Sequence, residues 1–233
     1  MNESSKSKQY WGPVEREATR GQGIDIGCGP DPVLPGVRRF DLEDGDANFA
    51  SRHVQEQFDF VYSSHCLEHM HDPRATILDW WKMVRPGGYL YILVPDEDLY
   101  EQGVFPSRFN PDHKATFTIA KAASWSPKSI NVLDLANSLP EGRIVSLELQ
   151  DRGYDRSLLT FGSRPLPFRM RCYLKLDRLL RKFTKASPSP AWRRNLAPYL
   201  PIDQTLPQFD AQAQIQLIVK KGGAAEGAAG AQT

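Results

Sequence analysis

Gly23-Ile24-Asp25-Ile26-Gly27-Cys28-Gly29-Pro30 is a short apolar run that contains one carboxylate and breaks abruptly into closely spaced glycines. Such a run is typical of a buried strand that turns tightly toward a helix, where backbone N–H groups can meet a ligand. A carboxylate such as Asp25 is costly to bury unless a positive group or hydrogen-bond donors meet it, and a cationic ligand would supply the positive group. The stretch therefore predicts a cofactor site.

The composition indicates one domain with insertions. The chain has 233 residues, of which 40% are hydrophobic and 24% charged, enough for one substantial core. The formal net charge of +1 gives no global attraction to nucleic acid or an anionic membrane. Three widely spaced cysteines (Cys28, Cys66 and Cys172) fit a reducing compartment better than a disulfide framework or a zinc site. With neither a signal peptide nor a spanning segment in evidence, we predict a cytoplasmic protein.

Repeated strand and helix patterns predict an α/β fold. Apolar segments at 23–27, 37–42, 58–62 and 89–94, and near 144–149, read as strands, whereas a strand is hard to place in 45–51. A helix opens at Asp72-Pro73 and ends before Arg85-Pro86-Gly87-Gly88. Strand, glycine turn and helix in repetition favour a parallel sheet with helices on both faces. Residues 1–9 are Ser/Lys-rich, and we expect them to be mobile.

Several polar residues follow the predicted strands. In a parallel sheet the ligand lies beyond the carboxyl ends of the strands. The residues expected to converge there are Gly27, Gly29, Asp41, Ser64, His65 and Asp96. Asp41 is the candidate acceptor for a ribose, because one carboxylate can take both hydroxyls. The alternative is a solvated loop carboxylate among Glu43, Asp44 and Asp46.

Four motifs occur together in the order and spacing of a known family: 24–29 as the cofactor loop, 58–61 as the fourth strand, His65-Cys66-Leu67-Glu68-His69 after it, and 84–88 before the fifth. Over residues 20–96 the chain resembles class I S-adenosylmethionine-dependent methyltransferases, in the branch called methyltransferase type 11. Pro30-Asp31-Pro32 replaces the third glycine that a dinucleotide-binding loop would have.

The resemblance implies a Rossmann-like, seven-stranded, mostly parallel sheet whose last strand, 214–220, is antiparallel. It also implies S-adenosyl-L-methionine as the cofactor, an adenine contact from Asp46, and a contribution from Cys28 in the loop. The expected cofactor-binding residues are Asp25, Gly27, Cys28, Gly29, Asp41, Asp46, Ser64 and His65. We assign no residue to a metal.

Transfer to an alcohol acceptor needs a base, because a free hydroxyl is a poor nucleophile. His113 is the first candidate, in a polar loop after the fifth strand, and Asp112 beside it is a candidate to orient its imidazole. The alternative is a surface histidine without a catalytic role. His65 is the second candidate base, because it lies at the strand edge itself.

The predicted activity is O-methylation of a sugar-containing acceptor, such as a surface polysaccharide or glycolipid, or of a small metabolite. The segment 106–114, with 203–205 and 211–215, is similar to segments of methyltransferases associated with bacterial surface-polysaccharide genes. We expect one methyltransferase domain over 1–221, insertions at about 97–140 and 151–210, and a disordered Gly/Ala-rich tail over 222–233.

Two alternatives remain at this stage. Residues 164–194 carry ten Lys or Arg side chains against a single acid, Asp177, with apolar residues interleaved at helical spacing. This pattern fits peripheral contact with an anionic membrane, a grip on a partner or on a phosphorylated substrate, or an ordinary surface helix. A non-catalytic cofactor-binding subunit that uses the basic insertion is therefore the first alternative. Nucleic-acid methylation is weaker, because no Asn/Asp-Pro-Pro-aromatic segment follows the fourth strand.

Overall fold

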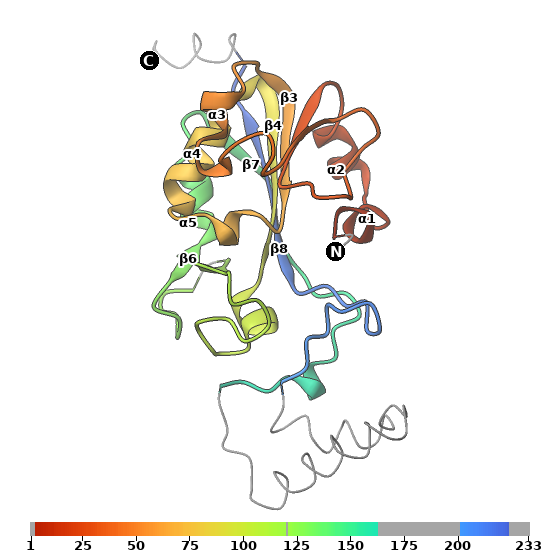
Figure 1. Ribbon diagram of the computed structural model, residues 1–233, viewed down its shortest axis with the longest axis vertical. Helices are drawn as coiled ribbons and strands as arrows, with labels where there is room; N and C mark the ends of the chain where they lie inside the picture. Colours follow the sequence, from red (N-terminus) through yellow and green to blue (C-terminus); the bar gives the residue numbers. More distant parts are fainter. Residues whose placement is uncertain (1–2, 120, 163–200, 224–233) are drawn as a thin grey trace, which may run out of the picture.

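The computed structural model describes residues 3–119, 121–162 and 201–223. Their main feature is a six-stranded sheet in the order β2-β1-β3-β4-β8-β7 (Figure 1). The strands are β1 (Gly23–Ile26), β2 (Arg38–Phe40), β3 (Phe58–Ser64), β4 (Val84–Pro95), β7 (Gly142–Gln150) and β8 (Gln214–Lys221). Neighbours among β1 to β4 are parallel, and β8 runs antiparallel to both β4 and β7. The predicted Rossmann-like sheet with an antiparallel last strand is confirmed.

The segment where a strand was hard to place folds as helix. It contains the 3-10 turn η1 (Ala47–Phe49) and α3 (Ala50–His53). Asp46 caps η1 by accepting from the backbone N–H of Asn48 at 2.9 Å. Among the described residues the main sheet therefore has six strands rather than the expected seven, with β2 at one edge and β7 at the other.

Helices cover both faces of the sheet (Figure 1). α1 (Glu3–Lys8) and α2 (Pro13–Ala18) lie on one side, and α3, α4 (Pro73–Lys82) and α5 (Val132–Asn137) lie on the other. The predicted start of α4 is confirmed, because the Asp72 side chain accepts from the backbone N–H groups of Arg74 and Ala75. No helix in the described ranges has the length and apolar character needed to cross a membrane.

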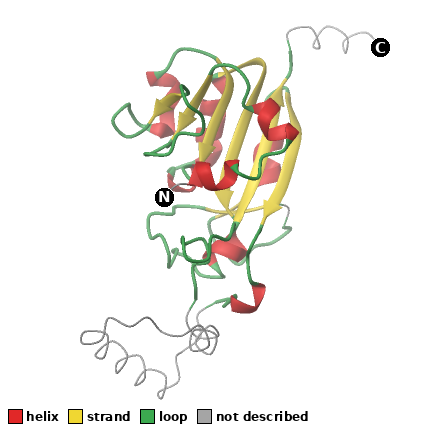
Figure 2. Cartoon of the chain, turned by 90° about the vertical axis from the view of Figure 1, so that its right-hand side faces the viewer, coloured by secondary structure: helices red, strands yellow, loops and turns green. Residues whose placement is uncertain are grey.

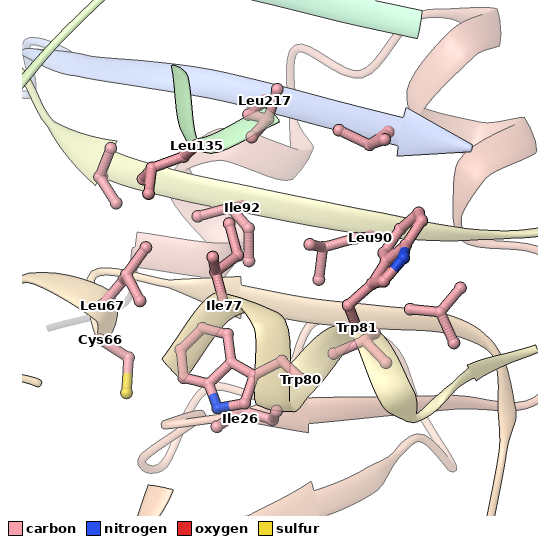
Figure 3. Packing of buried hydrophobic residues seen from close by; sticks show 14 of the residues in the cluster. Ile26, Cys66, Leu67, Ile77, Trp80, Trp81, Leu90, Ile92, Leu135 and Leu217 are labelled. Atoms are coloured by element: carbon pink, nitrogen blue, oxygen red, sulfur yellow. The ribbon is translucent and has the colours of Figure 1, made fainter. Parts of the chain in front are cut away.

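The larger core lies between the sheet and the helices on the α4 side of it (Figure 3). Trp80 on α4 is fully buried, and its indole N–H donates to the carbonyl of Ala47 at 2.8 Å. Ile92 on β4 and Leu217 on β8 contribute buried side chains from the sheet. This core packs the helices against the central strands and so fixes the position of the carboxyl ends of these strands.

Beyond the carboxyl ends of the parallel strands, short elements gather at one end of the molecule (Figure 2). The 3-10 turn η2 (Leu67–His69) follows β3, and the π-helical turn η3 (Glu97–Glu101) follows β4. β5 (Thr116–Thr118) and β6 (Ser129–Asn131) form a separate parallel pair, and η4 (Arg156–Leu158) follows β7. The whole basic segment 164–194, which includes Cys172, and residues 224–233 of the tail lie outside the described residues.

Candidate active site

A cavity of about 300 Å³ opens at the carboxyl ends of the strands. The loop after β1, the end of β3, η2, the segment after β4 and the segment before β8 all contribute to its wall. Six residues predicted for the site line it: Gly27, Cys28, Gly29, Ser64, His65 and His113. Cofactor-side and acceptor-side candidates therefore share one cavity.

The glycine loop turns sharply beside Cys66. Gly27 has φ of +75°, and a Cβ added there would lie 2.6 Å from Cβ and Sγ of Cys66. The Gly27 N–H donates to the carbonyl of Phe40 at 2.8 Å, which ties the loop to β2. Only glycine meets both the positive φ and the close approach.

Asp25 lies beneath this loop rather than on the cavity wall. Its side chain is fully buried, and Oδ2 accepts from the Val33 N–H at 2.7 Å. Oδ1 has no hydrogen-bond partner. Burial raises the pKa of this carboxyl to about 7, more than the Val33 hydrogen bond lowers it.

The other two predicted cofactor carboxylates also lie outside the cavity lining. Asp41 Oδ2 accepts from the Gly29 N–H at 2.6 Å, so it positions the tip of the glycine loop. Asp46 is engaged in capping η1, and the hydrogen bonds from Asn48 lower its pKa. Asp31, which sequence reasoning did not select, does line the cavity.

His65 and Glu68 form a charged pair on the cavity wall. His65 Nδ1 lies 3.4 Å from Glu68 Oε1, and its Nε2 lies 2.9 Å from Gln214 Oε1. Burial lowers the pKa of His65, but Glu68 more than offsets this and the pKa rises to about 9. Burial also opposes ionisation of Glu68, yet His65 brings the pKa of this carboxyl below its usual range. A protonated imidazole cannot accept a proton, so this geometry disfavours His65 as a base at neutral pH.

His113 is buried, with 5% of its surface exposed, so the alternative interpretation of a surface histidine is wrong. Its Nδ1 lies 2.6 Å from Oε1 of Glu101 at the end of η3, and its ring stacks on Tyr100 with centroids 5.3 Å apart. The prediction that Asp112 orients this imidazole is also wrong. Asp112 points to another histidine, with Oδ2 3.0 Å from His69 Nδ1.

Glu101, not a predicted site residue, is the carboxylate that orients His113. Glu101 is twelve positions from His113, and the two meet because η3 folds back under the loop that carries the histidine. Glu68 was visible as part of the motif 65–69 but was given no role. The charge of Glu68 is stabilised first by His65, three positions before it, and also by His113, which only tertiary folding brings near.

α1 covers one side of the cavity, so the expectation that residues 1–9 are mobile is wrong for the described helix. Lys6 Nζ donates to the carbonyls of Thr205 and Ala211 at 2.9 and 2.8 Å. Ser7 Oγ accepts from Gln214 Nε2 at 2.9 Å. These bonds join the first helix to the segment that leads into β8.

Comparisons with known proteins give one family match and several similar solved structures. Residues 11–125 match the family model of a methyltransferase domain. No curated protein sequence matches the chain. A solved S-adenosylmethionine-dependent methyltransferase from Archaeoglobus fulgidus is similar, with 13% identity, coverage of 94% of this chain and 92% of that one, and a TM-score of 0.45.

Two further similar structures are a Haloferax volcanii methyltransferase in complex with its Trm112 activator and a Haemonchus contortus enzyme. The first is 10% identical over 94% of this chain and 93% of that one, with a TM-score of 0.44. The second is phosphoethanolamine N-methyltransferase 2 in complex with phosphomonomethylethanolamine and S-adenosylhomocysteine. It is 12% identical over 90% of this chain and 51% of that one, with a TM-score of 0.45.

The fold and the matched domain define an S-adenosylmethionine-dependent enzyme. Residues 11–125 are a methyltransferase domain, which makes the chain an S-adenosylmethionine-dependent methyltransferase with S-adenosyl-L-methionine as its cofactor. The residues fit this group on two counts. Gly29 lines the cavity and has nothing within 4 Å of the place where a Cβ would stand, so a ligand can approach the backbone there. Asp25, buried beneath the loop with Oδ1 unpaired, would be stabilised in its ionised form by the positive charge of the bound ligand.

Proposed function

We propose that the enzyme methylates a hydroxyl oxygen of a sugar-containing or small-metabolite acceptor. The observation that carries this proposal is the buried imidazole of His113, which lines the same cavity as Gly27 and Gly29 and is fixed by Glu101. A hydroxyl needs such a base because it must lose its proton during transfer.

The residues divide the work along the cavity. The cofactor, when bound, supplies a methyl group activated on a sulfonium. The glycine loop, whose tip Asp41 positions through the Gly29 N–H, lines the part of the cavity proposed for the cofactor. His113 lines the part proposed for the acceptor. With Nδ1–H donating to Glu101, the His113 Nε2 lone pair is available to accept the acceptor's proton.

The wall that α1 adds to the cavity suits a reaction that depends on alignment and on the exclusion of water. α1 contributes Glu3, Ser4 and Lys6 to the wall, and its hydrogen bonds to the segment before β8 hold it in place. The similarity of segment 106–114 to methyltransferases of surface-polysaccharide genes supports a sugar-containing acceptor. Asn110 and His113 of this segment line the cavity.

The test separates cofactor binding from turnover. Calorimetry with S-adenosylmethionine should give similar affinities for the wild type and His113→Ala, while transfer of a labelled methyl group to a panel of defined glycans and nucleotide sugars should be lost in the variant. His71→Ala is the matched control, because His71 is exposed and lies outside the cavity lining. Turnover of His113→Ala at the wild-type rate would refute the assignment of the base. Cofactor binding without transfer to any acceptor, glycan or cell extract, would favour a non-catalytic subunit.

A further inference from the structure

Three side chains at the acceptor end of the cavity have a donor set typical of metal sites. Glu68, His69 and His113 each offer one ligand atom, and these atoms lie within 4.8 Å of one another. Glu68 and His69 come from η2, whereas His113 comes from the loop before β5. Both elements lie at the carboxyl end of the sheet, so the cluster is formed by the fold.

Each imidazole of the cluster has its Nδ1 held by a carboxylate outside the cluster. His69 Nδ1 lies 3.0 Å from Asp112 Oδ2, and His113 Nδ1 lies 2.6 Å from Glu101 Oε1. A ring that donates from Nδ1 keeps the lone pair on Nε2. The His113 Nε2 faces Glu68 Oε1 at 4.0 Å. Carboxylates that fix the second ring nitrogen in this way are the usual partners of metal-ligating histidines.

The carboxylate of Glu68 is an independent indication of a cation-binding site. Its side chain is 1% exposed, and neither oxygen has a hydrogen-bond partner. His65 supplies one positive charge at 3.4 Å, a distance beyond a good hydrogen bond. A buried carboxylate with unsatisfied oxygens is expensive to maintain, and a cation among Glu68, His69 and His113 would satisfy them.

We propose that Glu68, His69 and His113 bind a divalent transition-metal cation, of which Zn²⁺ and Mn²⁺ are the representative candidates. Two imidazole nitrogens and one carboxylate oxygen suit such ions and leave positions open for further ligands. Ligand atoms around one ion of this kind lie about 3 to 4 Å apart. Small side-chain rotations are therefore enough to bring the three donors into range.

The use of the cation in turnover rests on the proposed function. A cation here can hold an acceptor hydroxyl and lower its pKa. The O–H bond then releases its proton to water instead of to His113, whose Nε2 is engaged as a ligand. The oxygen forms the new bond to the methyl carbon, the bond from that carbon to sulfur breaks, and sulfur leaves with the electron pair as a thioether.

The test measures metal binding directly on the full chain. Titration with Co²⁺ should produce visible absorption bands that saturate at one ion per chain, and Zn²⁺ should displace it. Glu68→Gln and His113→Ala should each weaken binding at least tenfold, and Glu101→Gln should weaken it about 10- to 100-fold through the orientation of His113. His71→Ala, which changes an exposed histidine outside the cluster, should bind as the wild type does. Circular dichroism and thermal melts of each variant show whether it is folded.

The outcomes separate this inference from the proposed function. Absence of saturable binding at millimolar Co²⁺ and Zn²⁺, or binding that survives both Glu68→Gln and His113→Ala in folded protein, would overturn the metal site. Methyl transfer by protein that shows no saturable binding of Co²⁺ or Zn²⁺ would leave the proposed function standing while the metal site fails. Saturable binding that these two variants remove supports the site even if no acceptor hydroxyl is methylated.

Discussion

The affinity for S-adenosylmethionine should rise with pH up to about pH 7, and Asp25 should be the cause. Oδ1 of this carboxyl is buried without a partner, and burial raises its pKa to about 7. A cationic ligand favours the ionised carboxylate, so binding must include loss of the proton wherever Asp25 is protonated. Below pH 7 each pH unit then costs about 1.4 kcal/mol, which is tenfold in Kd. At about pH 5 binding should be roughly 100-fold weaker than its limit.

Calorimetry at about pH 5, 6 and 7, in two buffers that differ in ionisation enthalpy, measures both Kd and the protons released. The informative variant is Asp25→Asn, whose amide oxygen can still accept from the Val33 N–H but which does not titrate. We expect the Kd of Asp25→Asn to equal that of the wild type at about pH 5 and to stay constant between about pH 5 and 7. A flat Kd for the wild type between pH 5 and 7, or the same slope in Asp25→Asn, would refute the reasoning.

The same carboxyl makes a linked prediction for stability without cofactor. An acid whose pKa is raised by folding destabilises the folded state above its unfolded pKa. The penalty is absent below about pH 4, grows as the pH rises toward 7, and reaches about 4 kcal/mol above that, since the pKa moves from 3.8 to about 7. Asp25→Asn should therefore exceed the wild type in unfolding free energy at pH 8 but not at pH 4. A difference that is independent of pH would contradict this origin of the raised pKa.

Two further substitutions test the loop and the base. Gly27→Ala introduces both a strained φ of +75° and a clash, so it should lose cofactor binding and more unfolding free energy than Gly36→Ala, where φ is +77° with nothing within 4 Å. The strain alone is worth about 1 to 2 kcal/mol, and equal losses in denaturant melts would contradict a role for the clash. Glu101→Gln should lower kcat at least about tenfold with KM nearly unchanged, because His113 loses the carboxylate that fixes its tautomer. Glu56→Gln, on an exposed side chain, is the control, and an unchanged kcat for Glu101→Gln would exclude the positioning role.

The parts of the fold that could be predicted are those whose signals are local. The apolar run before Gly27 and the run 89–94 became buried strands, and Asp72-Pro73 became a helix start, because each pattern reports burial or capping within a few residues. The repetition of strand, glycine turn and helix then indicated a parallel sheet. The region 45–51 gave no strand signal, and it holds η1 and the start of α3.

The parts that could not be predicted depend on contacts between distant residues. The polar composition of residues 1–9 favours mobility, yet Ser7 is held by Gln214, a residue 207 positions away. Asp112 was the natural partner for His113 on sequence alone, but neighbouring side chains point apart and Glu101 takes the place. No periodicity in the sequence reports such pairings, because tertiary folding alone creates them.

The position of Glu101 links both chemical roles considered for His113. As a base, His113 needs Nδ1–H held so that Nε2 can take a proton, and as a metal ligand it needs the same tautomer so that Nε2 can bind the ion. Glu101 Oε1, 2.6 Å from Nδ1, meets both requirements. Substitution of Glu68 therefore distinguishes the two roles. A metal route requires Glu68 as a ligand, whereas proton transfer to His113 does not require it. Methyl transfer that persists in folded Glu68→Gln but fails in His113→Ala would identify the base route, whereas loss in both variants together with loss of Co²⁺ binding would identify the metal route.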